Sequence, residues 1–480
     1  MTTDTISAPA DPRAATGRFG LWIVFVGFGA LVVSLAQSLL IPVLPTLPGL
    51  LDSSSDQVAW LLTATLLASA VSIPLLGRLG DMFGTRRMLL VALGAMVVGS
   101  LVCALSDSLG VLIVGRAVQG VAAGAIPLGI SLLAGVLPRG RSGGAIAAVS
   151  AMLGVGGALG LPLAGFVAEH ADFHVLFWVT AVGALVAFAG VRLFVPEKAG
   201  RSGGRVDVLG AVLLAGALVS LLLPLAESSK WGWGSARVIG LLVASALFFA
   251  ALGWWQHRTS DPLIDLTALR RRPIVLTNIA SLLFGFALFA SLIGTASYVQ
   301  APESTGYGFG STMLVSGLVM LPSGLAMLAL APVSARLIVR RGAPFTLAVG
   351  AVVVALGWVM RILLTGSLLE VVVGTTVVGL GTAIGYAAMP SLINAHTPAG
   401  EIAAANGLNT LIRSVGSSLA SALGGAILAS SVVAVGAFAV PSLSAYRELF
   451  AMCAGAALLA AVVAVVLQRQ RVVADVAPAS

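Results

Sequence analysis

The sequence predicts an all-α integral membrane protein with fourteen transmembrane helices, arranged as two similar six-helix bundles with two helices inserted between them. Hydrophobic residues make up 59% of the 480 residues, and charged residues only 9%, against about 25% in soluble domains. Apolar runs long enough to cross a bilayer recur along the whole chain. The net charge of +8 must therefore be interpreted against membrane topology. This composition excludes a water-soluble enzyme and a nucleic-acid-binding domain.

Fourteen apolar segments reach the length of about 20 residues that a membrane-spanning helix needs. The first follows a polar tail that contains Arg13 and Arg18, and it is too long to be the apolar part of a signal peptide, so we interpret it as a retained span. The predicted spans are 21–44, 57–77, 87–106, 110–137, 142–168, 174–195, 206–226, 236–255, 274–299, 311–334, 345–364, 368–390, 402–434 and 444–467.

Basic residues test this count, because Lys and Arg collect in cytoplasmic loops. With the N-terminus inside, twenty of the 26 Lys and Arg residues fall in cytoplasmic segments and three in external ones. The other three, Arg116, Arg361 and Arg413, lie within spans, and Arg361 is so close to an outer end that we expect it at the membrane interface. We predict a multi-pass protein of the cell membrane with both termini in the cytoplasm. The Ala-, Arg- and Gly-rich composition suits a bacterial inner membrane.

An internal repeat divides the chain. The string G-R-L-G-D-M-F-G at 77–84 closes the second span, and A-R-L-I-V-R-R-G at 335–342 closes the tenth. Repeated halves are typical of secondary transporters, whose site lies between the halves. The predicted regions are a cytoplasmic tail (1–20), an N-terminal six-helix bundle (21–195), a cytoplasmic linker (196–205), two inserted helices (206–255), a second linker (256–273), a C-terminal six-helix bundle (274–467) and a cytoplasmic tail (468–480).

The short loop after the second span predicts a conformational latch. Gly77 and Gly84 permit a tight turn and a close approach of helices. Asp81 is a carboxylate among arginines that include Arg86 and Arg87, so we expect it to stay ionised and to hold neighbouring helices together through them. The alternative interpretation is an ordinary solvated loop of the positive side.

The same string resembles the signature loop of the major facilitator superfamily. Four more segments resemble the fourteen-span drug:proton antiporter branch of that superfamily: Q-V-A-W-L-L-T-A-T-L-L-A at 57–68, R-A-V-Q-G at 116–120, D-P-L-I-D-L at 261–266 and G-L-N-T-L-I-R-S-V-G at 407–416. Together they extend over nearly the whole chain. The resemblance implies a secondary active exporter of lipophilic drugs or metabolites that works by alternating access, as a proton-coupled antiporter with the proton gradient as its energy source.

Two departures from the branch pattern stand out. Its members often carry an acidic residue midway in span 1, and the matching position here is Ala36. The span-5 motif G-P-x-x-G-G is here G-L-P-L-A-G at 160–165. Gly160, Pro162 and Gly165 are still expected to bend span 5 and to let it pack closely against its counterpart in the other half.

Polar residues within spans are the candidates for a substrate cavity. A mid-span arginine costs about 2.5–3.5 kcal/mol on insertion scales, so Arg116 needs a polar partner, for which Ser34, Gln37 and Ser38 are candidates. The alternative is that Arg116 reaches the outer interface. The candidate cavity and coupling residues are Arg116, Gln119, Gly120, Gln37, Asn278 and Arg413.

None of the 18 acidic residues lies near the middle of a predicted span, whereas a membrane proton relay uses a buried Asp or Glu. Asp81 and Glu448 are the nearest substitutes. Proton coupling therefore depends on the resemblance, and Ala36 favours the alternative of an uncoupled or differently coupled lipid or metabolite transporter. A non-transporting membrane sensor is a remote alternative, because neither terminus is long enough for a signalling domain.

The sequence contains no motif for ATP binding or for enzyme catalysis. It has no nucleotide-binding G-x-x-x-x-G-K-[ST] loop and no catalytic triad pattern, so we expect no enzyme activity and no cofactor. The string E-H-A-D-F-H at 169–174 has metal-ligand residue types, but we interpret it as a solvated external turn and expect no metal. Cys103 and Cys453 lie in apolar runs and give no disulfide framework. The expected partners are a lipophilic small molecule and the lipid bilayer, without nucleic acid, and the expected state is a monomer.

Overall fold

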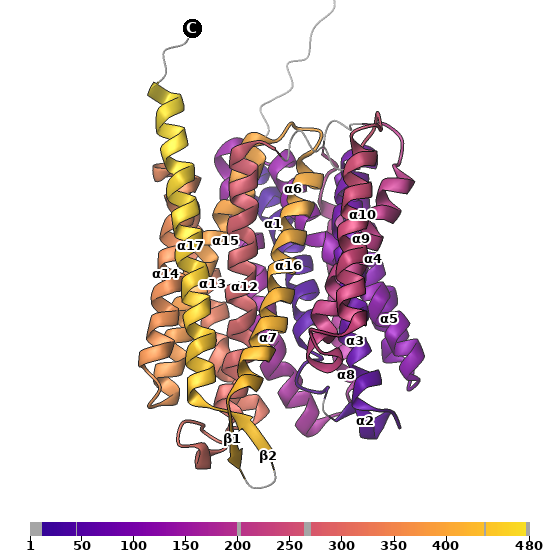
Figure 1. The fold of residues 1–480 in the computed structure, drawn as a ribbon. Coiled ribbons are helices and arrows are strands. Elements are labelled where there is room, and N and C mark those ends of the chain that lie inside the picture. The colour runs from indigo at the N-terminus through magenta and orange to yellow at the C-terminus, as the bar shows by residue number, and fades with distance from the viewer. Residues whose placement is uncertain (1–11, 45, 199–202, 264–269, 436–437, 477–480) are drawn as a thin grey trace, which may run out of the picture.

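The computed structural model describes residues 12–44, 46–198, 203–263, 270–435 and 438–476, which form an almost wholly helical molecule (Figure 1). Thirteen helices of this described part are long and apolar enough to cross a membrane, and α12 contains a further, shorter apolar stretch, Arg272–Leu288. In lipid no water can hydrogen-bond the backbone N–H and C=O groups. A helix pairs these groups within one segment, which is why such apolar runs form helices. The all-α membrane fold is confirmed, and the helix count is consistent with the fourteen predicted spans.

The helices follow one another in antiparallel fashion, so that their ends lie at two opposite ends of the molecule. We call the end that holds the start of α1 and the end of α17 the terminal end, and the opposite end, with strands β1 and β2, the hairpin end (Figure 1). The helices up to the linker are α1 (Pro12–Ser38), α2 (Leu47–Leu50), α3 (Ser55–Phe83), α4 (Thr85–Ala104), α5 (Leu109–Val121), η1 (Ala122–Gly124), α6 (Ala125–Val136), α7 (Arg139–His170) and α8 (His174–Phe194). The later elements are α9 (Val208–Trp231), α10 (Ala236–Gln256), α12 (Arg272–Gln300), η2 (Glu303–Thr305), α13 (Met313–Arg341), α14 (Ala343–Leu363), α15 (Leu368–His396), α16 (Ile402–Ser430), β1 (Val432–Val435), β2 (Phe438–Pro441) and α17 (Leu443–Val476).

Several predicted boundaries were wrong. The first span was predicted to reach residue 44, but α1 ends at Ser38, and Pro42 lies in the turns that follow. The span predicted as 402–434 ends at Ser430, because the next residues form an antiparallel hairpin in which Val433 pairs with Val440. β-Branched residues such as these valines favour strands over helices.

Helix α3 is longer than predicted, which changes where the latch residues lie. It continues to Phe83, so Gly77 and Asp81 belong to its last turns and not to a loop. The whole turn to α4 is made at Gly84, whose φ is 119°. Gly342, with a φ of 88°, makes the matching turn between α13 and α14. Both positions need a left-handed conformation, which explains the glycine that the two repeat strings share.

The two halves meet through two crossed pairs of helices: α3 packs against α16, and α7 packs against α13. The second long helix of each half thus meets the fifth of the other, so α7 does not pack against α16, its counterpart by position. Both contacts are close approaches of backbones. A Cβ on Gly77 would lie 2.7 Å from the carbonyl oxygen of Ala403, and a Cβ on Gly317 would lie 2.4 Å from the nitrogen of Pro162. Small residues allow such packing in membranes.

The buried cores differ between the halves. The core of α12–α17 is rich in aromatic rings, whereas that of α1–α8 is mostly aliphatic. Arg361, expected at the membrane interface, lies in the aromatic core and is fully buried. The expectation failed because the aromatic rings of α12 and α17 cover the end of α14, which sequence position alone does not reveal. Cys103 and Cys453 are both free and buried.

The inserted helices attach to the rest of the molecule through α9. This helix packs against both α3 and α16, while α10 packs against α9 and exposes most of its surface. Asp207 caps α9 by accepting a hydrogen bond from the N–H of Gly210 at 2.8 Å, and it also accepts from the side chains of Trp255 and Gln256. One carboxylate thereby ties the two inserted helices together at the terminal end.

We predict that Gly317→Ala lowers the stability of the purified protein by about 1–3 kcal/mol, because the added methyl group meets the backbone of Pro162 and an overpacked contact cannot relax cheaply. Thermal unfolding in detergent measures this. Gly240→Ala in α10 is the matched control, since nothing lies within 4 Å of a Cβ there. Equal melting temperatures for the two variants would contradict the close α7–α13 contact.

Candidate functional site

The Asp81 carboxylate joins the two halves at the terminal end. It is only 4% exposed, and its two oxygens accept hydrogen bonds from the backbone N–H groups of Ala403 at 3.2 Å and Ala404 at 2.8 Å. These residues open α16, where the first N–H groups of a helix have no intrahelical acceptor and the helix dipole is positive. A carboxylate is a favourable partner for such an end. The contact links residues 322 and 323 positions apart in the chain.

The partner of Asp81 differs from the prediction. Among the ion pairs of the described residues, none joins Asp81 to an arginine. Arg86 instead donates from Nε to the carbonyl oxygen of Val191 at 3.3 Å, and the backbone N–H groups of Arg86 and Arg87 donate to the carboxylate of Glu197. The arginines therefore belong to the junction of α4 with α8, within one half. Two backbone N–H groups at the start of α16 bind Asp81 in place of the predicted arginines.

Two further contacts join the halves close to Asp81. Lys198, after α8, donates from Nζ to the carbonyl oxygen of Ala399 at 3.0 Å. The close approach of Gly77 to Ala403 and of Gly407 to Ile73 completes the contact between α3 and α16. We call this set of contacts around Asp81 the latch. All of these contacts connect the N-terminal half with α16 or with the residues just before it.

Arg116, on α5, is buried inside the N-terminal half, where three oxygen atoms accept hydrogen bonds from its guanidinium. It is 2% exposed, its Nη1 donates to the carbonyl oxygen of Ala36 at 3.1 Å and to Oε1 of Gln119 at 2.9 Å, and its Nε donates to the carbonyl oxygen of Leu61 at 3.3 Å. Gln119 in turn donates to Ser100 at 2.7 Å. The alternative that Arg116 reaches the outer interface was therefore wrong.

The predicted partners of Arg116 were also wrong. Ser34 donates to the carbonyl oxygen of Leu153, Ser38 donates to that of Leu35, and Gln37 is exposed. Instead, the backbone carbonyl of Ala36 accepts a hydrogen bond from the guanidinium of Arg116. A cavity of about 10 Å³, the size of about one water molecule, lies beside this contact and is lined by Ala36, Leu39, Leu40, Arg116, Gln119, Leu176, Phe177 and Thr180.

Other predicted cavity residues are held in helix contacts. A Cβ on Gly120 would lie 2.6 Å from the carbonyl oxygen of Thr65, so this glycine serves the packing of α5 on α3. Asn278 of α12 accepts from Nδ2 of Asn409 of α16 at 2.8 Å. Arg413, also on α16, lies over the ring of Tyr386 with its Cζ 4.7 Å from the ring centre. Asn278 and Arg413 thus occupy the same pair of packed helices, and Arg116 lies in the other half.

The span-5 motif lies on α7 and contacts α1 in its own half and α13 in the other half. A Cβ on Gly160 would overlap the hydroxyl of Ser38 on α1, and a Cβ on Gly165 would lie 2.9 Å from the nitrogen of Leu314 on α13. Pro162, between them, faces Gly317. Helix α7 continues through Pro162 from Arg139 to His170. The motif therefore places α7 between α1 of its own half and α13 of the other.

Sequence reasoning missed Glu227. This carboxylate on α9 is 6% exposed, accepts from the hydroxyl of Thr63 on α3 at 3.3 Å, and lies 3.5 Å from Nζ of Lys230. Lys230 also pairs with Asp56 at 2.9 Å. A Glu and a Lys three residues apart at the end of an apolar helix would have indicated this pair. By contrast, Glu448 is exposed, and Asp265 lies outside the described residues.

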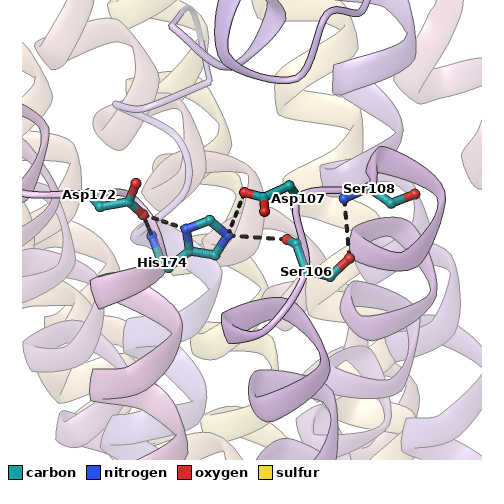
Figure 2. Close-up of polar contacts among 5 residues, drawn as sticks. All are labelled: Ser106, Asp107, Ser108, Asp172 and His174. Atoms are coloured by element: carbon teal, nitrogen blue, oxygen red, sulfur yellow. Dashed lines mark hydrogen bonds and ion pairs between the residues drawn. The ribbon is translucent and has the colours of Figure 1, made fainter.

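His174, from the string at 169–174 that has metal-ligand residue types, links the loop before α8 to the loop after α4 by polar contacts. Figure 2 shows the imidazole of His174 between Asp172 and Asp107, with Nε2 3.5 Å from Asp107 and 3.1 Å from the carbonyl oxygen of Ser106. Nδ1 contacts Asp172, which also accepts from the backbone N–H of His174 at 2.8 Å. That backbone bond, aided by the imidazole, lowers the pKa of Asp172. Both ring nitrogens are engaged, and no three potential ligands within the described ranges are grouped to hold a metal ion.

Comparisons with known proteins agree with this architecture. The profile of the Major Facilitator Superfamily matches residues 26–421 and 303–480. The chain is 30% identical over 442 residues to the tetracenomycin C resistance and export protein of Streptomyces glaucescens, covering 90% of this chain and 81% of that one. It is 28% identical over 420 residues to the multidrug resistance protein Stp of Mycobacterium tuberculosis, covering 87% and 75%.

A solved structure shows the same fold. The human organic anion transporter MFSD10 (TETRAN) superposes with a TM-score of 0.65 at 17% identity, covering 93% of this chain and 99% of that chain. The profile extends over most of the chain, and the described helices form two halves joined by a latch at one end. This chain is a multi-pass membrane transporter and belongs to the major facilitator superfamily.

Proposed function

We propose that this transporter is a secondary active exporter of lipophilic drugs or metabolites, working as a monomer by alternating access and driven by proton antiport. The observation that carries the proposal is the bond from Asp81 of the first half to the N-terminus of α16 in the second. A bond between halves that closes one end is what a transporter needs if its site is to face one side at a time. The names of the two bacterial relatives, which refer to resistance and export, support the direction and the class of substrate.

The orientation follows from charge. Most Lys and Arg residues lie in segments at the terminal end, and basic residues mark the cytoplasmic side. We therefore place the latch in the cytoplasm and the hairpin end outside. With the latch closed, the transporter is shut towards the cytoplasm, which is the state from which an exporter releases its substrate.

The substrate would bind between the halves, against α15 and α16, which contact α7 and α3 of the N-terminal half. The polar groups near this contact are amides and hydroxyls, apart from Arg413, and the ring of Tyr386 covers that cation. Apolar walls with a few polar groups suit lipophilic ligands. No buried carboxylate of the described residues lies among these groups, so neutral and weakly charged compounds fit better than strong cations.

Glu227 is our candidate for the proton-carrying residue. Its carboxylate is buried within the membrane part of α9, near the outer end, and the Lys230–Asp56 pair connects it with the external solution. Thr63 links it to α3, the helix whose other end carries Asp81. Protonation of Glu227 would remove its charge and so weaken the hydrogen bond that it accepts from Thr63, which links α9 to α3. Because α9 also packs on α16, this change would reach both halves.

The competing function is transport without a proton cycle. It is favoured by Ala36, since the guanidinium of Arg116 is satisfied there by neutral oxygens and needs no acid. The two functions differ in one observable, which is whether movement of the compound moves protons.

We predict that Asp81→Asn impairs export while membrane insertion stays normal. The amide keeps one acceptor oxygen but loses the charge, so the closed terminal end should lose about 1–2 kcal/mol, or roughly a five- to thirtyfold change in its population. Efflux of a neutral lipophilic dye such as Nile red, from cells with matched protein levels, measures this. Asp52→Asn, at an exposed position outside the latch, is the control. Normal efflux by Asp81→Asn would refute the latch.

Everted membrane vesicles test the coupling. Adding lipophilic compounds to vesicles with an acidic interior should release the pH gradient when the wild-type chain is present. We predict that Glu227→Gln abolishes this release, because the amide cannot bind a proton, whereas uptake of the compound down its own gradient continues. Glu448→Gln, an exposed acid that receives the same substitution, should behave like wild type.

Each outcome of this experiment is informative. Proton release by Glu227→Gln at the wild-type level would reject Glu227 as the carrier but keep antiport. Movement of compound without proton release in the wild-type chain would reject antiport itself and leave the uncoupled transporter.

A further inference from the structure

A buried arginine in the C-terminal half has no hydrogen-bond acceptor. Arg361 on α14 is 0% exposed, and within the part of the chain that the structure describes, its Nε, Nη1 and Nη2 all lack a partner. Arg116 is buried to a similar degree but has three acceptors. A buried guanidinium normally pairs its charge and its N–H groups, so the surroundings of Arg361 require an explanation.

Aromatic rings enclose this guanidinium. Its Cζ lies 5.0 Å from the ring centre of Tyr298 on α12 and 4.9 Å from that of Phe450 on α17. The ring of Tyr446 lies 5.2 Å from Tyr298. Ring faces attract a cation and offset part of the cost of burying it. They offer no oxygen to the N–H groups, however, since the hydroxyl of Tyr298 is directed to the carbonyl oxygen of Thr365 at 3.4 Å.

A second buried N–H group near Arg361 also lacks a hydrogen-bond acceptor. The indole N–H of Trp358, one turn before Arg361 on α14, has no partner, and Trp358 is 0% exposed. Its ring lies 5.2 Å from Phe450, the ring that Arg361 also contacts. Arg361 and Trp358 therefore present a positive charge and several N–H donors to one aromatic enclosure. The carboxylate of Glu370, on the neighbouring helix α15, is directed to the backbone N–H of Gly366 at 2.7 Å.

Donors and positive charge without acceptors fit an anion. We propose that Arg361 and Trp358 bind a monatomic anion, with chloride as the natural ligand, inside the aromatic enclosure at the hairpin end of the C-terminal half. Arg361 lies two residues before the end of α14, Tyr298 two residues before the end of α12, and Phe450 in the second turn of α17. The site is thus close to the external solution, but it is fully covered, which excludes a phosphate headgroup or an organic carboxylate. The anion would fix the outer ends of three helices and takes no part in the proton cycle.

Halide-dependent stability of the purified full-length chain tests the site. Replacing gluconate by chloride or bromide at constant ionic strength should raise the melting temperature saturably, by about 2 °C or more, because a ligand that binds only the folded state stabilises it. Inorganic phosphate should have no such effect. Equal melting temperatures in gluconate and in both halides would mean that water alone meets these donors, and it would overturn the proposal.

Variants locate the effect. Arg361→Gln should lose the halide dependence, and Trp358→Phe, which keeps a ring but removes the N–H, should raise the halide concentration for half-maximal stabilisation roughly three- to tenfold. Arg237→Gln is the matched control, because it removes an exposed positive charge at the start of α10, away from the enclosure, and should leave the dependence unchanged. Undiminished dependence in Trp358→Phe or Arg361→Gln would place the anion elsewhere.

A second measurement covers the case in which Arg361→Gln does not fold. Trp358→Phe and bromide anomalous scattering from wild-type crystals then decide, because anomalous density away from Arg361 would refute the site.

Discussion

A charge buried in a bilayer needs a partner from the chain or from a bound ligand, and the polar interior of this transporter follows from that constraint. Asp81 is satisfied by the open N–H groups of a helix in the other half, Arg116 by carbonyl oxygens of its own half, and Arg413 by the face of Tyr386. The three solutions differ in what they connect. Of these three, only the first crosses between the halves, so only the first would be broken and remade in the proposed transport cycle.

The crossed helix pairs give the two ends of the molecule different properties. The α7–α13 contact runs along much of both helices and is made by backbone against backbone, with few polar groups. The α3–α16 contact adds hydrogen bonds concentrated at the terminal end. A smooth apolar contact can rotate at little cost, whereas the hydrogen bonds are either made or broken. This combination suits a movement between two discrete states.

Much of the fold could be predicted from the sequence, because long apolar runs and the placement of arginines are strong signals. The predicted helix ends were less accurate, as with α3 and α16. Hydropathy does not change at these ends, which are set instead by a glycine turn after α3 and by a β-hairpin after α16. For the site, residue types were easier to find than partners. Asp81 could be named from its motif, yet the group that binds it is a backbone N–H 322 residues away in the chain. Glu227 and Arg361 escaped because their burial depends on helices that are distant in sequence.

The acceptor that Ala36 offers to Arg116 belongs to the peptide backbone. Every amino acid carries that carbonyl, so the side chain at position 36 is free to vary without leaving the guanidinium unsolvated. A single codon change could therefore introduce an acid there without removing this contact. A change of ion coupling that acted through position 36 would need no rearrangement of the buried hydrogen bonds around Arg116.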